Sequence, residues 1–231
     1  MNKLLSILLL SASMLTLHAC DEEDDDPTTI TTEYDLVKTR TTYGQTTTYT
    51  YDAQDRIIRE DYESGGYAIV TFTSEQATYT TYDTLGVAQE IYEYQLNSDG
   101  NIISGPGVAW TYNSDGRILT ITYTNSTDTN VTTNEYTNGN LTRSSANGST
   151  TQYSTYTYLT DKVETRMAGS RTLYGNPSYN LLSSFTNHDG TNPSSTYTYT
   201  YTYDSKGRVI TQTQSDNGGG IFDVESYTYF D

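Results

Sequence analysis

Cysteine and histidine are almost absent from this chain of 231 residues. Cys20 is the single cysteine, and the two histidines are His18 and His188. One cysteine leaves no disulfide framework. So few thiols and imidazoles nearly exclude zinc clusters and Cys/His or Ser/His dyads, and we expect no metal and no cofactor. His188 lies within Asn187-His188-Asp189-Gly190, a turn composition that predicts a solvated loop histidine.

Basic charge is scarce as well. The chain has 12 Lys and Arg against 29 Asp and Glu, a formal net charge of −17. A surface of that sign does not attract nucleic acid or an anionic membrane surface, so we expect no nucleic-acid partner. Six of the acids are consecutive and repel one another, which predicts an extended, solvated tether at residues 20–29. They are Asp21, Glu22, Glu23, Asp24, Asp25 and Asp26.

Long apolar runs occur only at the start of the chain. Lys3 precedes an apolar stretch at residues 4–10 that is too short for a stable membrane span, so residues 1–19 are predicted to be a cleaved signal peptide. Leu17-His18-Ala19-Cys20 resembles the lipobox of bacterial lipoproteins. The resemblance implies that Cys20 is acylated, palmitate included, and becomes the new N-terminus, which anchors the protein in the outer membrane. The alternative is a plain signal peptide with a chance cysteine.

The acidic run after Cys20 resembles the export signal with which some Gram-negative lineages send lipoproteins to the outer face of the outer membrane. That resemblance implies exposure to the cell exterior, and the alternative is an acidic spacer with no signal role. A further short match is Asp83-Thr84-Leu85, which resembles the acceptor pattern of a bacterial O-glycosylation system and makes Thr84 a candidate site.

Tyrosine is the residue that the chain has in excess, with 24 copies interspersed with threonine. Residues 201–210, Tyr-Thr-Tyr-Asp-Ser-Lys-Gly-Arg-Val-Ile, read as one β-hairpin, because period-two alternation flanks a polar turn whose glycine tolerates positive φ. No amphipathic helix period follows Cys20, and residues 178–186 are the only place where a short helical turn competes. We therefore predict an all-β chain.

Variants of this hairpin recur along residues 30–231. We count them by the aliphatic residue after each turn, and the two longest intervals suggest hidden degenerate units, near 72–77 and 182–187. A repeat of about 22 residues predicts a single antiparallel meander of roughly 14–18 strands, rolled or closed into a barrel-like sheet. The counted positions are Ile57, Ile102, Ile118, Leu141, Val163 and Val209.

These units resemble the YD or Rhs repeat, Tyr-x-Tyr-Asp-x-x-Gly-Arg-aliphatic, with Asp55 standing where glycine is usual. With the lipobox in front, the chain resembles a family of bacterial lipoproteins of unknown function with a porin-like β-meander. The resemblance implies a surface scaffold rather than a catalyst. A membrane-embedded barrel is a weaker alternative, because the outward positions would be mostly Thr, Ser and Gln. Tyr229-Phe230 near the end of the chain favours such a barrel, since outer-membrane barrels often end in an aromatic strand.

No constellation in the sequence predicts a reaction, so no catalytic residue is assigned. Glu60 with Asp61, or Glu90 with Glu93, are carboxylate pairs of the kind that glycoside hydrolases use, but chance pairs are expected among so many acids. The turns at 97–100 and 113–116 superficially resemble calcium loops, lack the downstream Glu, and are better explained by Asx turns. Gly218-Gly219-Gly220 precedes no helix and reads as a hairpin loop.

The leading function is therefore a non-enzymatic scaffold or binding module for a glycan or a cell-surface protein. A carbohydrate-active hydrolase is the alternative, and a transport barrel is a third, weaker possibility. Aromatic rings in excess of core needs predict a rim site, since exposed rings beside polar groups bind sugars. Trp110 and Tyr197 are the candidate ligand-binding residues, and ordinary core packing is the competing explanation for both.

Overall fold

The computed structural model describes residues 35–167, 173–190 and 192–230, and every regular element in them is a β-strand. Cys20 and the acids at 21–26 lie outside the described residues. The strands are β1 (Asp35–Thr42), β2 (Gln45–Tyr51), β3 (Ile57–Tyr62), β4 (Tyr67–Phe72), β5 (Gln76–Tyr82), β6 (Ala88–Leu96), β7 (Ile102–Gly105), β8 (Val108–Tyr112), β9 (Ile118–Thr124), β10 (Thr129–Thr137), β11 (Asn140–Ala146), β12 (Gln152–Val163), β13 (Arg166–Met167), β14 (Asn180–Asp189), β15 (Asn192–Tyr203), β16 (Val209–Ser215) and β17 (Ile221–Tyr229).

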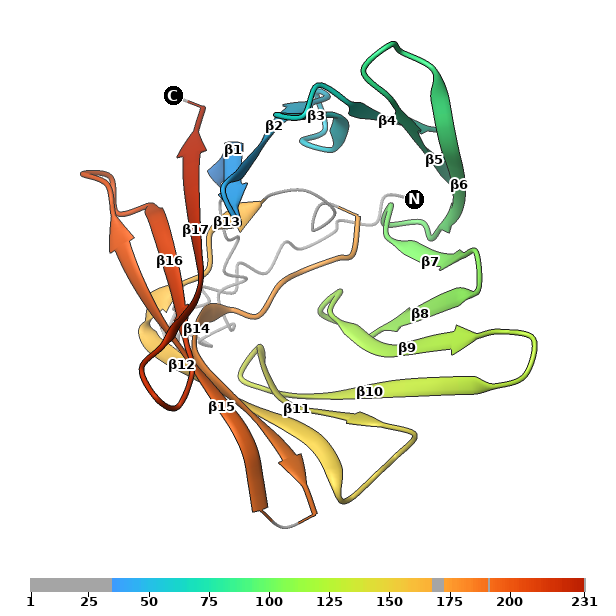
Figure 1. Ribbon diagram of the computed structural model, residues 1–231. Coiled ribbons are helices and arrows are strands. Elements are labelled where there is room, and N and C mark those ends of the chain that lie inside the picture. Colours follow the sequence, from blue (N-terminus) through green and yellow to red (C-terminus); the bar gives the residue numbers. More distant parts are fainter. Residues whose placement is uncertain (1–34, 168–172, 191, 231) are drawn as a thin grey trace, which may run out of the picture. The chain divides into compact units, whose positions relative to one another are not determined.

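The strands close into a barrel. Each pairs antiparallel with its neighbours in sequence, except that β12 pairs directly with β14, and β17 returns to pair with β1. Two-residue β13 stands apart and pairs parallel with the start of β1. The ring of antiparallel strands, seen end-on in Figure 1, leaves no open sheet edge among them. The all-β, closed-barrel prediction is confirmed, with 16 strands in the ring.

The alternative of a short helical turn within residues 178–186 does not occur, and one position of the repeat count is wrong. Residues 180–189 form strand β14 rather than a helical turn, because both partners β12 and β15 hold them extended. Val163 ends β12 and is 37% exposed, whereas Leu181, at the start of β14, is 1% exposed and is the true post-turn aliphatic residue. In the degenerate second unit, strands β12 and β14 are separated by residues 164–179, of which the structure describes 164–167 and 173–179.

The hairpin turns share one hydrogen-bond device. In the turn at 204–208 the Asp204 Oδ1 atom accepts from the backbone N–H groups of Lys206 and Arg208, and Oδ2 accepts from the Arg208 guanidinium. Asn97 and Asn113 make the same backbone bonds, which confirms Asx turns in place of calcium loops. The last turn position needs positive φ, and Asp55 adopts it at +60° where Gly207 has +84°.

A second device explains the abundance of tyrosine. At five places a residue near the start of a strand lies at a β-bulge, and a tyrosine hydroxyl from an adjacent strand donates to that residue's carbonyl oxygen. A bulge removes a carbonyl from the regular ladder, so the hydroxyl satisfies a group that the sheet leaves unpaired. The pairs are Tyr51 with Val37, Tyr112 with Ile102, Tyr136 with Ile118, Tyr201 with Leu182 and Tyr229 with Val209.

The buried side chains gather at one end of the barrel. We call it the plugged end; it carries the turns at 52–56, 97–101, 113–117 and 204–208, and the opposite end is the far end. Buried residues occupy the first or last positions of the strands there, among them Val37, Ile57, Ile102, Leu96 and Val209.

Residues 164–167 and 173–179, the crossing segment, lie across the lumen at the plugged end (Figure 1, orange). On one side the backbone of Thr165 accepts from Asp35 of β1. On the other side Leu173 accepts from Ile102 of β7, and Tyr179 donates to Gly139 in the β10–β11 turn. The segment therefore ties opposite walls together.

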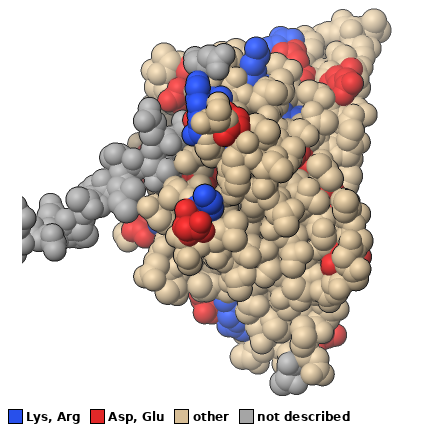
Figure 2. Space-filling model, turned by 90° about the vertical axis from the view of Figure 1, so that its left-hand side faces the viewer, with Lys and Arg blue, Asp and Glu red and all other residues tan. Residues whose placement is uncertain are grey.

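Threonine covers the outer wall. Thr228 alternates with buried Tyr227 and Tyr229 and so faces outward, where its hydroxyl hydrogen-bonds Thr39 at 2.7 Å. Similar cross-strand pairs join Thr111 to Thr120 and Thr202 to Thr211. Figure 2 shows one outer face as a largely uncharged surface with scattered acidic and basic residues. At these positions the wall presents threonine hydroxyls outward, while the tyrosines that alternate with them on β15 and β17 face the lumen; the stacked Tyr67 and Tyr82 and the exposed Leu119 and Val224 also lie on the outer wall.

Candidate functional site

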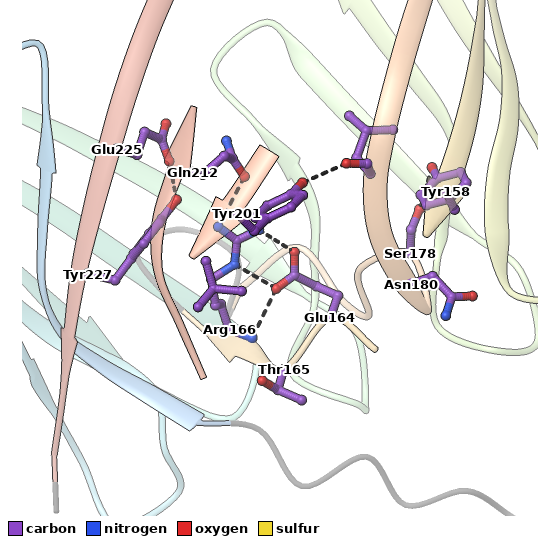
Figure 3. A network of polar contacts seen from close by, with 12 residues as sticks. Tyr158, Glu164, Thr165, Arg166, Ser178, Asn180, Tyr201, Gln212, Glu225 and Tyr227 are labelled. Carbon is purple, nitrogen blue, oxygen red and sulfur yellow. Dashed lines mark hydrogen bonds and ion pairs between the residues drawn. The ribbon is translucent and has the colours of Figure 1, made fainter. Parts of the chain in front are cut away.

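The crossing segment is held by a buried ion pair. Arg166 donates from Nε and Nη2 to both carboxylate oxygens of Glu164, at 2.8 and 2.6 Å, and from Nη1 to Gln212 of β16 at 3.1 Å (Figure 3). Its guanidinium lies 4.8 Å from the Tyr227 ring centroid and 5.7 Å from that of Tyr201. Burial alone lowers the Arg166 pKa, but the bonds and charge of Glu164 outweigh it and raise the pKa above its ordinary value. The pair stays charged and fixes the segment to β15–β17.

A second charged group faces the lumen from β1 and β17. Arg40 forms an ion pair with Glu225, which also accepts a hydrogen bond from the Tyr227 hydroxyl. Burial raises the Glu225 pKa, but the hydrogen bonds from Arg40 and Tyr227 outweigh it, so the pKa of Glu225 lies below its ordinary value. Glu225 is therefore a carboxylate at neutral pH.

The lumen contains two cavities that share the crossing segment as a wall. Each has a volume of about 350 Å³, within the range of small-molecule sites. The Arg40 cavity lies against β1 to β7, with Arg40, Glu60 and tyrosines above an apolar floor that includes Leu173. The Asn180 cavity lies against β9 to β14 and is lined by amides, hydroxyls and tyrosines, including Asn134, Tyr158 and Asn180.

An aromatic row covers the inner wall of β12, β14 and β15 away from the plugged end. It consists of Tyr156, Phe185, Tyr197, Tyr199 and Phe222. Phe185 and Tyr197 stack with centroids 4.8 Å apart, and Phe222 of β17 meets Tyr197 edge-on at 5.7 Å. Phe222 is 56% exposed. The next inward layer toward the far end is polar: Ser154 and Ser195 both hydrogen-bond Asn187.

The two candidate ligand-binding aromatics have different positions. Trp110 is only 8% exposed and packs on Tyr174 of the crossing segment with centroids 5.3 Å apart, so the expectation that it lies at a rim is wrong. Trp110 is buried because the crossing segment covers this part of β8. The repeat pattern does not reveal that segment. Tyr197 is partly exposed and belongs to the aromatic row.

The remaining candidates are separated in space. His188 lies on β14 rather than in a loop, with its ring 4.4 Å from that of Tyr153 and its Nε2 bonded to Thr155. Glu60 accepts from Tyr62 and Tyr79, while Asp61, one residue on, pairs with Arg59. Glu90 accepts from Tyr92, while Glu93 is exposed three positions further along the strand. Since residues at odd spacing on a strand point to opposite faces, neither carboxylate pair flanks a common site.

Thr84 lies in the β5–β6 turn at the far end and is exposed. Among the described residues no helix is long and apolar enough to cross a membrane.

Sequence reasoning missed the Glu164–Arg166 pair and both cavities; it named Glu60 only as part of a carboxylate pair with Asp61. Glu164 and Arg166 flank Thr165 with no motif around them, and their burial depends on Tyr201, Gln212 and Tyr227, which lie 35 or more residues away in sequence. The inward position of Arg40 follows from a bulge between Val37 and Thr39, which shifts the alternation of β1.

Comparison with known proteins supports the architecture. A porin-like protein from Bacteroides uniformis superposes with a TM-score of 0.58 at 18% identity, over 85% of this chain and 99% of that one. A porin-like protein from Bacteroides vulgatus gives a TM-score of 0.57 at 13% identity, over 84% and 99%. No family model and no curated protein matches the chain. At these identities the likeness shows the fold alone, and that fold is a porin-like β-barrel.

Proposed function

We propose that this chain is an outer-membrane lipoprotein, anchored through Cys20 and facing the cell exterior, whose barrel binds a glycan without hydrolysing it. The observation that carries the binding role is the aromatic row. A pyranose ring has an apolar C–H face that stacks on aromatic rings and hydroxyl groups that need hydrogen-bond partners.

The surroundings of the row provide those partners. Ser154, Asn187 and Ser195 lie one layer toward the far end, and Tyr199 pairs across β16 with Gln214 and Asp223. The row therefore offers stacking surfaces with amide, hydroxyl and carboxylate groups at its edge. A protein ligand would be expected to use a larger apolar patch, so a glycan is the better match.

The outer wall supports an anchored barrel that stands in water. A lipid-facing wall needs apolar side chains at alternate positions, whereas threonine hydroxyls occupy these positions on β1, β8, β15 and β17. Attachment to a membrane is then the role of the lipid on Cys20, and the acidic run at 21–26 directs the barrel outward.

Affinity electrophoresis in gels containing dextran, mannan, xylan or hyaluronan tests the binding role. We expect at least one polysaccharide to retard the wild-type chain and Tyr197→Ala to abolish the retardation, because stacking on one ring contributes about 1 kcal/mol or more. Tyr67→Ala is the matched control: Tyr67 also stacks on another tyrosine, Tyr82, at 4.7 Å, but outside the row. Equal retardation of wild type and Tyr197→Ala by every polysaccharide would refute the assignment.

A further inference from the structure

The Arg40 cavity has the composition of a sugar site, at a place distinct from the aromatic row. Its floor is apolar, with Ile57, Val70, Ile102 and Leu173, while Arg40 and Glu60 supply opposite charges. Tyr92 and Tyr94 of β6 and Tyr174 of the crossing segment line its sides. Such an amphipathic lining suits a ligand that has one apolar face and a polar edge.

The cavity holds hydrogen-bond donors in excess. The ion pair with Glu225 uses a single Nη atom of Arg40, and the guanidinium carries five N–H groups. Its Nε–H is buried without an acceptor among the described residues, which is a free-energy cost. The Arg40 side chain is still 38% exposed, so the guanidinium can turn toward an oxygen atom that enters the cavity.

The cavity also holds an acceptor in excess. The hydroxyls of Tyr62 and Tyr79 each lie 3.1 Å from Oε2 of Glu60 and 2.7 Å from each other, and Oε1 accepts no hydrogen bond from the described residues. Burial raises the pKa of Tyr62 to about 12 and raises that of Tyr79 further, so both hydroxyls remain neutral donors at physiological pH. Glu60 is thereby oriented with one oxygen atom left for a ligand.

A hydroxyl group is both donor and acceptor, so a polyol satisfies Arg40 and Glu60 together. An anionic ligand would face the Glu60 and Glu225 carboxylates, and a purely apolar one would bury Glu60 without a donor. We propose that the Arg40 cavity binds one neutral monosaccharide ring, held by Arg40 and Glu60 at its hydroxyls and by the tyrosines at its C–H face. The volume of about 350 Å³ is near the lower limit of ligand sites, which suits a single ring.

Saturation-transfer NMR on the purified full chain tests whether the Arg40 cavity binds a monosaccharide. The probes are D-glucose, D-galactose, D-mannose and N-acetyl-D-glucosamine. We expect saturable binding of at least one probe. Glu60→Gln preserves the volume and an acceptor for Tyr62 and Tyr79 but replaces the second oxygen atom with an amide donor. It should weaken binding about tenfold, the effect of losing one charge-assisted hydrogen bond.

Glu90→Gln is the matched control. Glu90 also accepts from the tyrosine two residues on, Tyr92, but does not line the cavity. Val70→Phe fills the apolar floor of the cavity and replaces no polar group, so it should abolish binding. If Glu60→Gln does not fold, this variant tests whether the sugar occupies the cavity. The emission of Trp110, the single tryptophan, which packs on Tyr174, checks that each variant is folded.

Binding that survives Tyr197→Ala and Glu90→Gln but is weakened in Glu60→Gln and lost in Val70→Phe supports the proposal, whether or not polysaccharides bind the aromatic row. Failure of all four sugars to bind overturns it. Binding that is unchanged in Glu60→Gln or Val70→Phe also overturns it, and loss in Tyr197→Ala alone would assign the sugar to the aromatic row.

Discussion

At the scale of single residues, tyrosine serves two roles that composition does not separate. Tyr112 and Tyr201 use their hydroxyls to satisfy bulge carbonyls at the plugged end. Tyr197 makes no such hydrogen bond with the described residues and contributes its ring to the aromatic row. The alternation Tyr-Thr-Tyr predicts which face a ring occupies, but the role depends on whether a bulge lies across from the hydroxyl.

Replacing a carbonyl-bonded tyrosine by phenylalanine should therefore destabilise the barrel. Tyr112→Phe leaves the Ile102 carbonyl buried without its donor, and we expect the free energy of unfolding to fall by about 1–3 kcal/mol. Tyr197→Phe removes a hydroxyl that is not bonded to a bulge carbonyl, so it should change the free energy of unfolding by less than about 0.5 kcal/mol. Urea unfolding monitored by Trp110 fluorescence measures both. Equal losses would show that the hydroxyl bonds contribute nothing specific.

At the scale of elements, the turns were predictable and the crossing segment was not. Asx residues, glycine or Asp55, and arginine at fixed spacing specify the hairpins locally, so the approximate strand count of a rolled or closed sheet could be predicted from the sequence. Closure itself depends on the pairing of β17 with β1, at opposite ends of the chain. The crossing segment, residues 164–167 and 173–179, shows no period of the repeat, and its position is set by partners in β1, β7 and β16, far away along the chain. Both cavities and the burial of Trp110 depend on that segment, which is why the site could not be predicted in full.

The Glu164–Arg166 pair should be the main anchor of this segment. Arg166→Met leaves the Glu164 carboxylate buried without the guanidinium, and we expect the free energy of unfolding to fall by about 3–5 kcal/mol. The double variant Glu164→Gln, Arg166→Met removes both charges and should recover much of the loss, because no buried carboxylate remains. Chemical unfolding of the wild type, the two single variants and the double variant gives the coupling free energy between Glu164 and Arg166. Additive losses would mean that the two side chains act independently.

At the scale of the whole molecule, the barrel separates stability from binding. Most buried residues lie at the plugged end, where the crossing segment joins opposite walls. The aromatic row lies toward the other end, on strands β12, β14 and β15, whose backbones are fixed by pairing on both sides. Rigid strands position a binding surface well, so a closed sheet with a threonine exterior suits a display scaffold.

We expect attachment and display of that scaffold to depend on residues 20–26. We expect the wild-type chain in the membrane fraction, starting at Cys20 and carrying acyl chains by intact mass, since two or more chains give a lasting anchor. Cys20→Ala should yield a soluble or uncleaved protein. Replacing the six acids at 21–26 with Asn and Ser should preserve the anchor but protect the barrel from protease added to intact cells, which should cleave the wild type.

The same intact mass tests Thr84: a sugar mass beyond the lipid that disappears in Thr84→Ala assigns the modification to that exposed turn. Membrane partitioning of Cys20→Ala indistinguishable from wild type would contradict the lipid anchor. Equal shaving of the wild-type and neutralised chains would show that the acids serve only as a spacer. Under the proposed function the anchor on Cys20 and the signal at 21–26 are separate features, so we expect Cys20→Ala to change membrane attachment and the neutralised acids to change only exposure to protease.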